Sequence, residues 1–118
     1  DNVHLLGHVS ENEKSWYYNH CSAFALPSIS EGFGLPLAEA MSCGKPLFLS
    51  DRTALPEIGG DVSFYFRDFQ PDHMQQVFHS GMNNYNSNGL KKRIMERGRN
   101  FNWDKAALQY LEVYRSLY

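Results

Sequence analysis

The chain has 118 residues, of which 42% are hydrophobic and 20% are charged, and its formal net charge at pH 7 is −2. These values fit one folded domain over residues 1–118 and exclude collagen-like, disordered and coiled-coil chains, and they do not support nucleic-acid binding. The apolar runs are far shorter than the roughly 18 residues of a membrane-spanning helix. The N-terminus shows no signal-peptide pattern. Since the sequence has no initiator Met and enters a predicted strand almost at once, we expect it to be part of a longer chain.

The charges are unevenly distributed along the chain. Residues 1–90 hold 4 basic and 10 acidic side chains, whereas residues 91–118 hold 7 basic and 3 acidic ones. The basic segment is compatible with peripheral contact with an anionic membrane or an acidic partner, although a solvated helix face is the simpler interpretation. Cys21 and Cys43 do not form a CxxC pair, so we expect a reducing, cytoplasmic location and no zinc site.

The order of the predicted elements indicates the fold class. Apolar runs bounded by turn residues predict four strands, at residues 3–9, 23–26, 45–50 and 62–66. Helical patterns separate and follow them, at residues 10–20, 36–44, 55–60, 74–82, 90–101 and 103–118, with a polar loop at residues 83–89. The first helix opens on a capping box formed by Ser10 and Glu13. This alternation predicts an α/β domain whose mainly parallel sheet has about four strands.

A glycine-containing turn at residues 31–36 is the most informative segment. It joins the predicted strand at residues 23–26 to a helix, and in open α/β sheets such turns lie where ligands bind. Gly32 and Gly34 allow positive φ angles and a close approach of a ligand to the main chain. The following helix N-terminus attracts an anion, most simply a phosphate. Leu37 breaks the GxGxxG dinucleotide fingerprint, and no P-loop lysine is present.

Two acidic residues flank this turn. Glu31 precedes the glycines and Glu39 lies in the helix that follows, so each can accept hydrogen bonds from the hydroxyls of a sugar or ribose. The alternative is purely structural: a tight strand-to-helix connection, with a glutamate that complements the helix dipole.

The segment Glu-Gly-Phe-Gly-Leu-Pro-Leu-Ala-Glu, residues 31–39, resembles the signature of retaining nucleotide-sugar glycosyltransferases of the GT-B architecture, family 4. Four other segments resemble motifs of the same family in the same order, at residues 6–9, 26–28, 55–61 and 101–103. The resemblance implies a Rossmann-like sheet flanked by helices that forms part of the C-terminal, donor-binding domain.

The same resemblance implies roles for particular residues. Glu31 would be the catalytic residue that contacts and orients the transferred sugar, and Glu39 would hold the ribose hydroxyls. The main-chain amides of Gly32, Phe33, Gly34 and Leu35 would lie against the sugar and diphosphate, and the main chain near Val9 would face the base. The family needs no metal or other cofactor, and its substrate is a nucleoside-diphosphate sugar.

The sequence departs from the family pattern at Thr53 and Ala54, where a Gly-Gly pair commonly precedes the Leu-Pro-Glu turn. The resemblance also implies two earlier strands of the donor domain, a basic Arg/Lys pair and an N-terminal acceptor domain, which the 118 residues do not include. We therefore expect the isolated chain to be inactive. Because the missing strands would flank residues 23–26, we expect either that residues 3–6 pair with this strand or that the chain self-associates through its free edge.

The sequence leaves two functions open. The first is the donor-binding part of a glycosyltransferase, which fixes the diphosphate and stabilises charge as the sugar–phosphate bond breaks. The second is a non-catalytic nucleotide-binding or protein-interaction module with the same fold.

Overall fold

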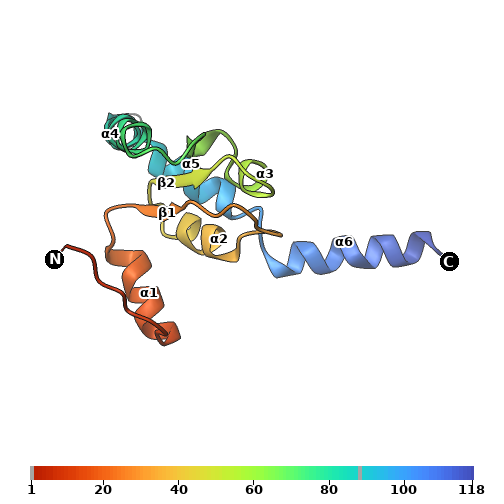
Figure 1. Ribbon diagram of the computed structural model, residues 1–118. Helices are drawn as coiled ribbons and strands as arrows, with labels where there is room; N and C mark the ends of the chain where they lie inside the picture. The colour runs from red at the N-terminus through yellow and green to blue at the C-terminus, as the bar shows by residue number, and fades with distance from the viewer. Residues whose placement is uncertain (1, 88) are drawn as a thin grey trace.

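The computed structural model describes residues 2–87 and 89–118 of the chain (Figure 1). Its strands β1 (Phe24–Leu26), β2 (Leu47–Ser50) and β3 (Phe64–Phe66) form a parallel sheet in the order β1-β2-β3. The helices are α1 (Glu11–His20), α2 (Leu35–Ser42), α3 (Leu55–Gly59), α4 (Pro71–Ser87), α5 (Leu90–Gly98) and α6 (Trp103–Ser116), with a 3-10 turn at Gly60–Val62. The predicted α/β class and parallel sheet are confirmed.

The central strand β2 is buried on both faces, as its continuous apolar run predicts. Leu47 and Leu49 face the main core, which contains the buried side chains of α2, α3 and α5: Leu37, Ala40, Met41, Leu55, Ile58, Leu90 and Ile94. Phe48 points to the opposite face, where its ring packs against those of Phe64 and Phe78. Helix α4 therefore covers one face of the sheet, and α2, α3 and α5 cover the other (Figure 1).

Residues 3–9 do not form the predicted strand. They are irregular and largely exposed, with Leu5 95% exposed, and Gly7 turns the chain with a φ of 65°. Strand β1 is consequently an edge strand of the three-stranded sheet, and the expected pairing of residues 3–6 with it is wrong. The physical reason is that a strand exists only through hydrogen bonds to a neighbour, and an apolar run does not reveal which neighbour is available.

The predicted polar loop at residues 83–89 is also largely wrong, because α4 continues to Ser87. Asn83, Asn84 and Asn86 occupy its exposed side, whereas Tyr85 turns inward and donates a hydrogen bond to the carbonyl of Gly44 (2.7 Å). The contact of Tyr85 thus ties this polar end of α4 to the turn after α2. Asn88, within the same predicted loop, lies outside the described residues.

Helix α6 projects from the body of the domain (Figure 1), and none of its residues is buried. The radius of gyration is 16.0 Å. A compact chain of this length is expected to have a radius of gyration of about 13.5 Å. Among residues 2–87 and 89–118, no helix combines the length and apolar character needed to cross a bilayer. Cys21 and Cys43 are both free.

Candidate functional site

The candidate site is built on the loop that joins β1 to α2, at the carboxyl end of the parallel sheet. Ser50, the last residue of β2, is fully buried, and its hydroxyl donates a hydrogen bond to the carbonyl of Ser28 at the start of this loop. The edge of the sheet and the loop are therefore fixed to each other. This is where ligands bind in open α/β folds.

The main chain of the loop offers a series of hydrogen-bond donors. The N–H groups of residues 32–35 donate to no other group within the described part of the chain. The eight-residue helix α2 begins at the end of this series, with its partial positive charge at the same place. Successive free N–H groups at a helix N-terminus suit a phosphate or another anion.

The two glycines of the turn differ in their local geometry. Gly34 is buried, has a φ of 87° and caps α2, and a Cβ atom there would lie 3.1 Å from Cδ2 of Leu55. Gly32 is exposed, its φ is not positive, and a Cβ atom there would meet nothing within 4 Å. The prediction that both glycines can use positive φ angles is thus correct only for Gly34, whereas Gly32 leaves open space beside the main chain.

Glu31 is held through its main chain rather than its side chain. Its N–H donates to the hydroxyl Oγ1 of Thr53 (3.0 Å), in the loop that follows β2. Thr53 has a φ of 51°, a conformation that is uncommon for a β-branched residue. This is one of the two positions where the sequence departs from the pattern of the resembling family, and the threonine hydroxyl anchors the main chain of Glu31.

The two apolar residues of the turn remain accessible. Phe33 packs edge-to-face on Phe101, with ring centroids 5.7 Å apart, and is still 38% exposed. Leu35, the first residue of α2, is 55% exposed. Both side chains therefore lie at the surface, on either side of the buried Gly34.

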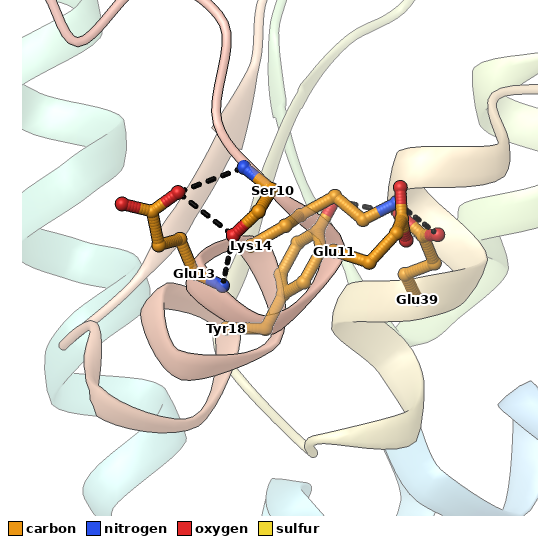
Figure 2. Close-up of polar contacts among 6 residues, drawn as sticks. All are labelled: Ser10, Glu11, Glu13, Lys14, Tyr18 and Glu39. Carbon is orange, nitrogen blue, oxygen red and sulfur yellow. Dashed lines mark hydrogen bonds and ion pairs between the residues drawn. The ribbon is translucent and has the colours of Figure 1, made fainter.

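Glu39 lies in the second turn of α2, where its side chain meets α1 (Figure 2). Its Oε1 accepts a hydrogen bond from Nζ of Lys14 (3.1 Å), and its Oε2 accepts one from the hydroxyl of Tyr18 (3.0 Å). Lys14 also pairs with Glu11 (2.9 Å). Within the described residues, Glu31 and Glu39 share no hydrogen-bond partner: one is anchored to the loop after β2 and the other to α1.

The predicted base-contact segment lies at the entrance to α1. Val9 is half-buried and immediately precedes Ser10, the N-cap residue of this helix. Ser10 lies one turn before Lys14, whose N–H donates to the Ser10 carbonyl (2.9 Å). Figure 2 shows Ser10, Lys14 and Glu39 in one group of side chains. Two sequence segments predicted to contact different parts of one nucleotide, Val9 and Glu39, are thus carried by adjacent elements.

Three groups of α1 have a shifted pKa, and two of them lie at this contact. Burial, and then the hydrogen bond to Glu39, raise the pKa of Tyr18. Hydrogen bonds to Glu11 and Glu39 raise the pKa of Lys14 and keep it charged. Hydrogen bonds from the main chain and side chain of Ser10 lower the pKa of Glu13.

Lys14, Tyr18 and Ser50 are the residues near the site that the sequence alone did not reveal. Lys14 and Tyr18 are four residues apart and therefore lie on the same side of α1. The sequence shows this spacing, but it does not show that Glu39 is the residue that Lys14 and Tyr18 contact, because that depends on how α1 docks on α2. Ser50 looked like the polar end of a strand.

Comparison with known proteins identifies the family. The family described as glycosyl transferases group 1 matches residues 1–101. The chain belongs to this family.

Individual relatives extend the match over nearly the whole chain. The chain is 29% identical to O-antigen chain mannosyltransferase B of Escherichia coli, over 98% of this chain and 30% of that protein. It is 29% identical to MMP alpha-(1->4)-mannosyltransferase of Mycolicibacterium hassiacum, over 97% of this chain and 29% of that protein. It is 28% identical to D-inositol 3-phosphate glycosyltransferase of Streptomyces bingchenggensis, over 89% of this chain and 24% of that protein. This glycosyl transferases group 1 chain therefore spans less than a third of the length of these relatives.

Proposed function

We propose that this chain is the donor-binding part of a retaining glycosyltransferase of the GT-B architecture. It would bind a nucleoside-diphosphate sugar. The rest of the protein would supply the acceptor site and the basic Arg/Lys side chains that neutralise the diphosphate. The observation that carries the proposal is the run of free N–H groups at residues 32–35, at the start of α2 and between Glu31 and Glu39. Membership of the family supports it independently.

Each part of the site has a distinct task in this proposal. The N–H groups of residues 32–35 hold the diphosphate and stabilise the negative charge that develops as the sugar–phosphate bond breaks. Glu31 accepts hydrogen bonds from the transferred sugar and orients it, without donating a proton. Glu39 accepts those of the ribose, and the main chain near Val9 faces the base. Catalysis is then positioning combined with electrostatic stabilisation, with no metal ion required.

The transferred sugar is a hexose in this proposal, and mannose is the first candidate to test. Two of the relatives described above are named mannosyltransferases, one from Escherichia coli and one from Mycolicibacterium hassiacum. The third is named D-inositol 3-phosphate glycosyltransferase, a name that does not specify the transferred sugar.

Calorimetry with the whole protein tests the donor site. UDP-glucose and GDP-mannose are titrated into the wild type and into Glu31→Ala and Glu39→Ala variants, and turnover is measured with the same donors. We expect Glu39→Ala to weaken donor binding at least tenfold, because hydrogen bonds to a charged group contribute about 1.5–3 kcal/mol. Glu31→Ala should mainly lower turnover. Unchanged affinity and turnover in both variants would show that these residues do not bind the donor.

One observation favours the alternative, a non-catalytic module: both carboxylate oxygens of Glu39 already accept hydrogen bonds within the chain. If Glu39 only joins α1 to α2, Glu39→Ala should lower the free energy of unfolding and leave donor binding unchanged. The two roles are thus separated by comparing stability with affinity in one variant.

A further inference from the structure

Helix α1 contacts α2 through Lys14 and Tyr18, and its Asn19 carbonyl accepts a hydrogen bond from Nζ of Lys45 (2.8 Å). None of the residues of α1 is buried, and the segment that precedes the helix is irregular. Its side chains Lys14 and Tyr18 nevertheless converge on one carboxylate, that of Glu39 (Figure 2). The ring of Tyr18 also packs near that of Phe24, with centroids 5.8 Å apart, which links this contact to β1.

The two donors bind different oxygens of the carboxylate. Lys14 donates to Oε1 and Tyr18 to Oε2, so rotation of the carboxylate about its terminal bond would break both hydrogen bonds. A carboxylate has about four lone-pair positions and only two are used here, which leaves one on each oxygen for further hydroxyl groups. The side chain of Glu39 is 41% exposed, so these positions are open to a ligand.

We propose that Tyr18 and Lys14 are positioning residues for the nucleotide: they fix the Glu39 carboxylate so that its remaining lone pairs receive the two ribose hydroxyls. The inference rests on the proposed function, since it takes Glu39 as the ribose-binding group. In this arrangement α1 pre-organises the acceptor before the nucleotide arrives. The conformational entropy of the Glu39 side chain is then already lost in the folded protein, so binding of the nucleotide does not have to order that side chain.

Lys14 has a second effect in this arrangement. A carboxylate close to a diphosphate would repel it, and the ammonium group of Lys14 offsets the charge of Glu39 while also pairing with Glu11. Tyr18 carries no charge and acts through orientation alone. The two residues should therefore differ in their dependence on salt, with the contribution of Lys14 falling as ionic strength rises.

The test compares ligands with and without the ribose hydroxyls. GDP and UDP, each beside its 2′,3′-dideoxy counterpart, are titrated into the whole protein as wild type, Tyr18→Phe and Tyr17→Phe. Tyr18→Phe keeps the ring and its packing and removes only the donor to Glu39. We expect it to weaken binding of the ribonucleotide three- to tenfold and to leave binding of the dideoxynucleotide unchanged. Tyr17→Phe removes a hydroxyl from an exposed neighbour on the same helix and should change neither.

Each other outcome has a definite meaning. An equal loss for both ligands would show that Tyr18 only stabilises the fold, and a gain in ribonucleotide affinity would show that Tyr18 competes with the ribose; either result overturns the inference. Glu39→Gln, measured alongside, separates it from the proposed function. If Glu39→Gln removes the preference for the ribonucleotide and Tyr18→Phe does not, the inference alone fails. If Glu39→Gln also leaves that preference intact, the ribose-binding role of Glu39 fails with it.

Discussion

At the scale of single residues, Gly32 and Gly34 have different reasons to be glycine. Gly34 has a structural reason, since it caps α2 with a positive φ and packs closely on Leu55. Gly32 has none in the fold itself, because its φ is not positive and its surroundings are open. The absence of a side chain at Gly32 is explained if a ligand occupies that space.

Substitution of each glycine by alanine tests this difference. Gly34→Ala should lower the free energy of unfolding by about 1–2 kcal/mol, the cost of a left-handed conformation for a residue with a Cβ atom. Gly32→Ala should change it by less than about 0.5 kcal/mol, yet weaken binding of a sugar nucleotide several-fold because the methyl group occupies the ligand's space. Urea denaturation and calorimetry measure the two quantities. A Gly32→Ala variant with unchanged affinity would show that the donor does not approach the main chain at this residue.

At the scale of elements, α1 depends on its capping box. The Ser10 hydroxyl accepts from the N–H of Glu13 (3.3 Å), and the Glu13 carboxylate accepts from the Ser10 main chain (2.8 Å). These contacts lower the pKa of Glu13 below its ordinary value of 4.5. A carboxyl group whose pKa is lower in the folded state stabilises the fold above its unfolded pKa, and this stabilisation is lost as the pH falls through the folded value.

We therefore expect α1 to loosen below about pH 4.5, before the core helices do. Amide hydrogen exchange of residues 11–20, compared with that of α5, measures this between pH 6 and pH 3. In a Glu13→Gln variant, the pH dependence of α1 protection should be smaller over this range, whereas Glu112→Gln on α6 should leave the dependence intact. Equal acid sensitivity of α1 in the wild type and in Glu13→Gln would contradict the assignment to Glu13.

The elements also show what a sequence can and cannot predict. Local sequence patterns predict the three strands and the capping box of α1. Apolar runs bounded by turn residues mark the strands at 24–26, 47–50 and 64–66, and the spacing of Ser10 and Glu13 marks the capping box. The segment at residues 3–9 has a similar pattern and forms no strand, since a strand also requires a neighbour. The candidate site at residues 31–39 could be proposed from its motif, and it stays a prediction. The contacts of Glu39 with Lys14 and Tyr18 were not, because they arise only when α1 docks on α2.

At the scale of the whole molecule, α6 has no buried residue and presents an apolar side that nothing in the described part of the chain covers. Trp103, Ala106, Tyr110, Val113 and Leu117 recur at helical spacing on one side, and the four large ones are 55–79% exposed. The free edge of β1 is a second such surface. Contiguous apolar surface of this kind is uncommon on a monomer and favours association.

We expect the isolated chain to self-associate at micromolar concentrations, as its free sheet edge also predicts. Sedimentation equilibrium measures the association constant. Tyr110→Glu, on the apolar side of α6, should weaken association at least tenfold if α6 forms the contact, and Gln109→Glu, on the polar side, should not. Association that persists in Tyr110→Glu would place the contact elsewhere, for example at β1. A wild-type chain that remains monomeric at high concentration would contradict the prediction.

The central claim is that the turn between β1 and α2 receives a sugar nucleotide between Glu31 and Glu39. The most direct measurement is a crystal structure of the whole protein with a bound nucleoside-diphosphate sugar. We expect the diphosphate on the N–H groups of residues 32–35, the sugar on Glu31, and the ribose hydroxyls on a Glu39 carboxylate that keeps its hydrogen bonds to Lys14 and Tyr18. A nucleotide bound away from this turn, with the N–H groups of residues 32–35 facing only water, would contradict the account.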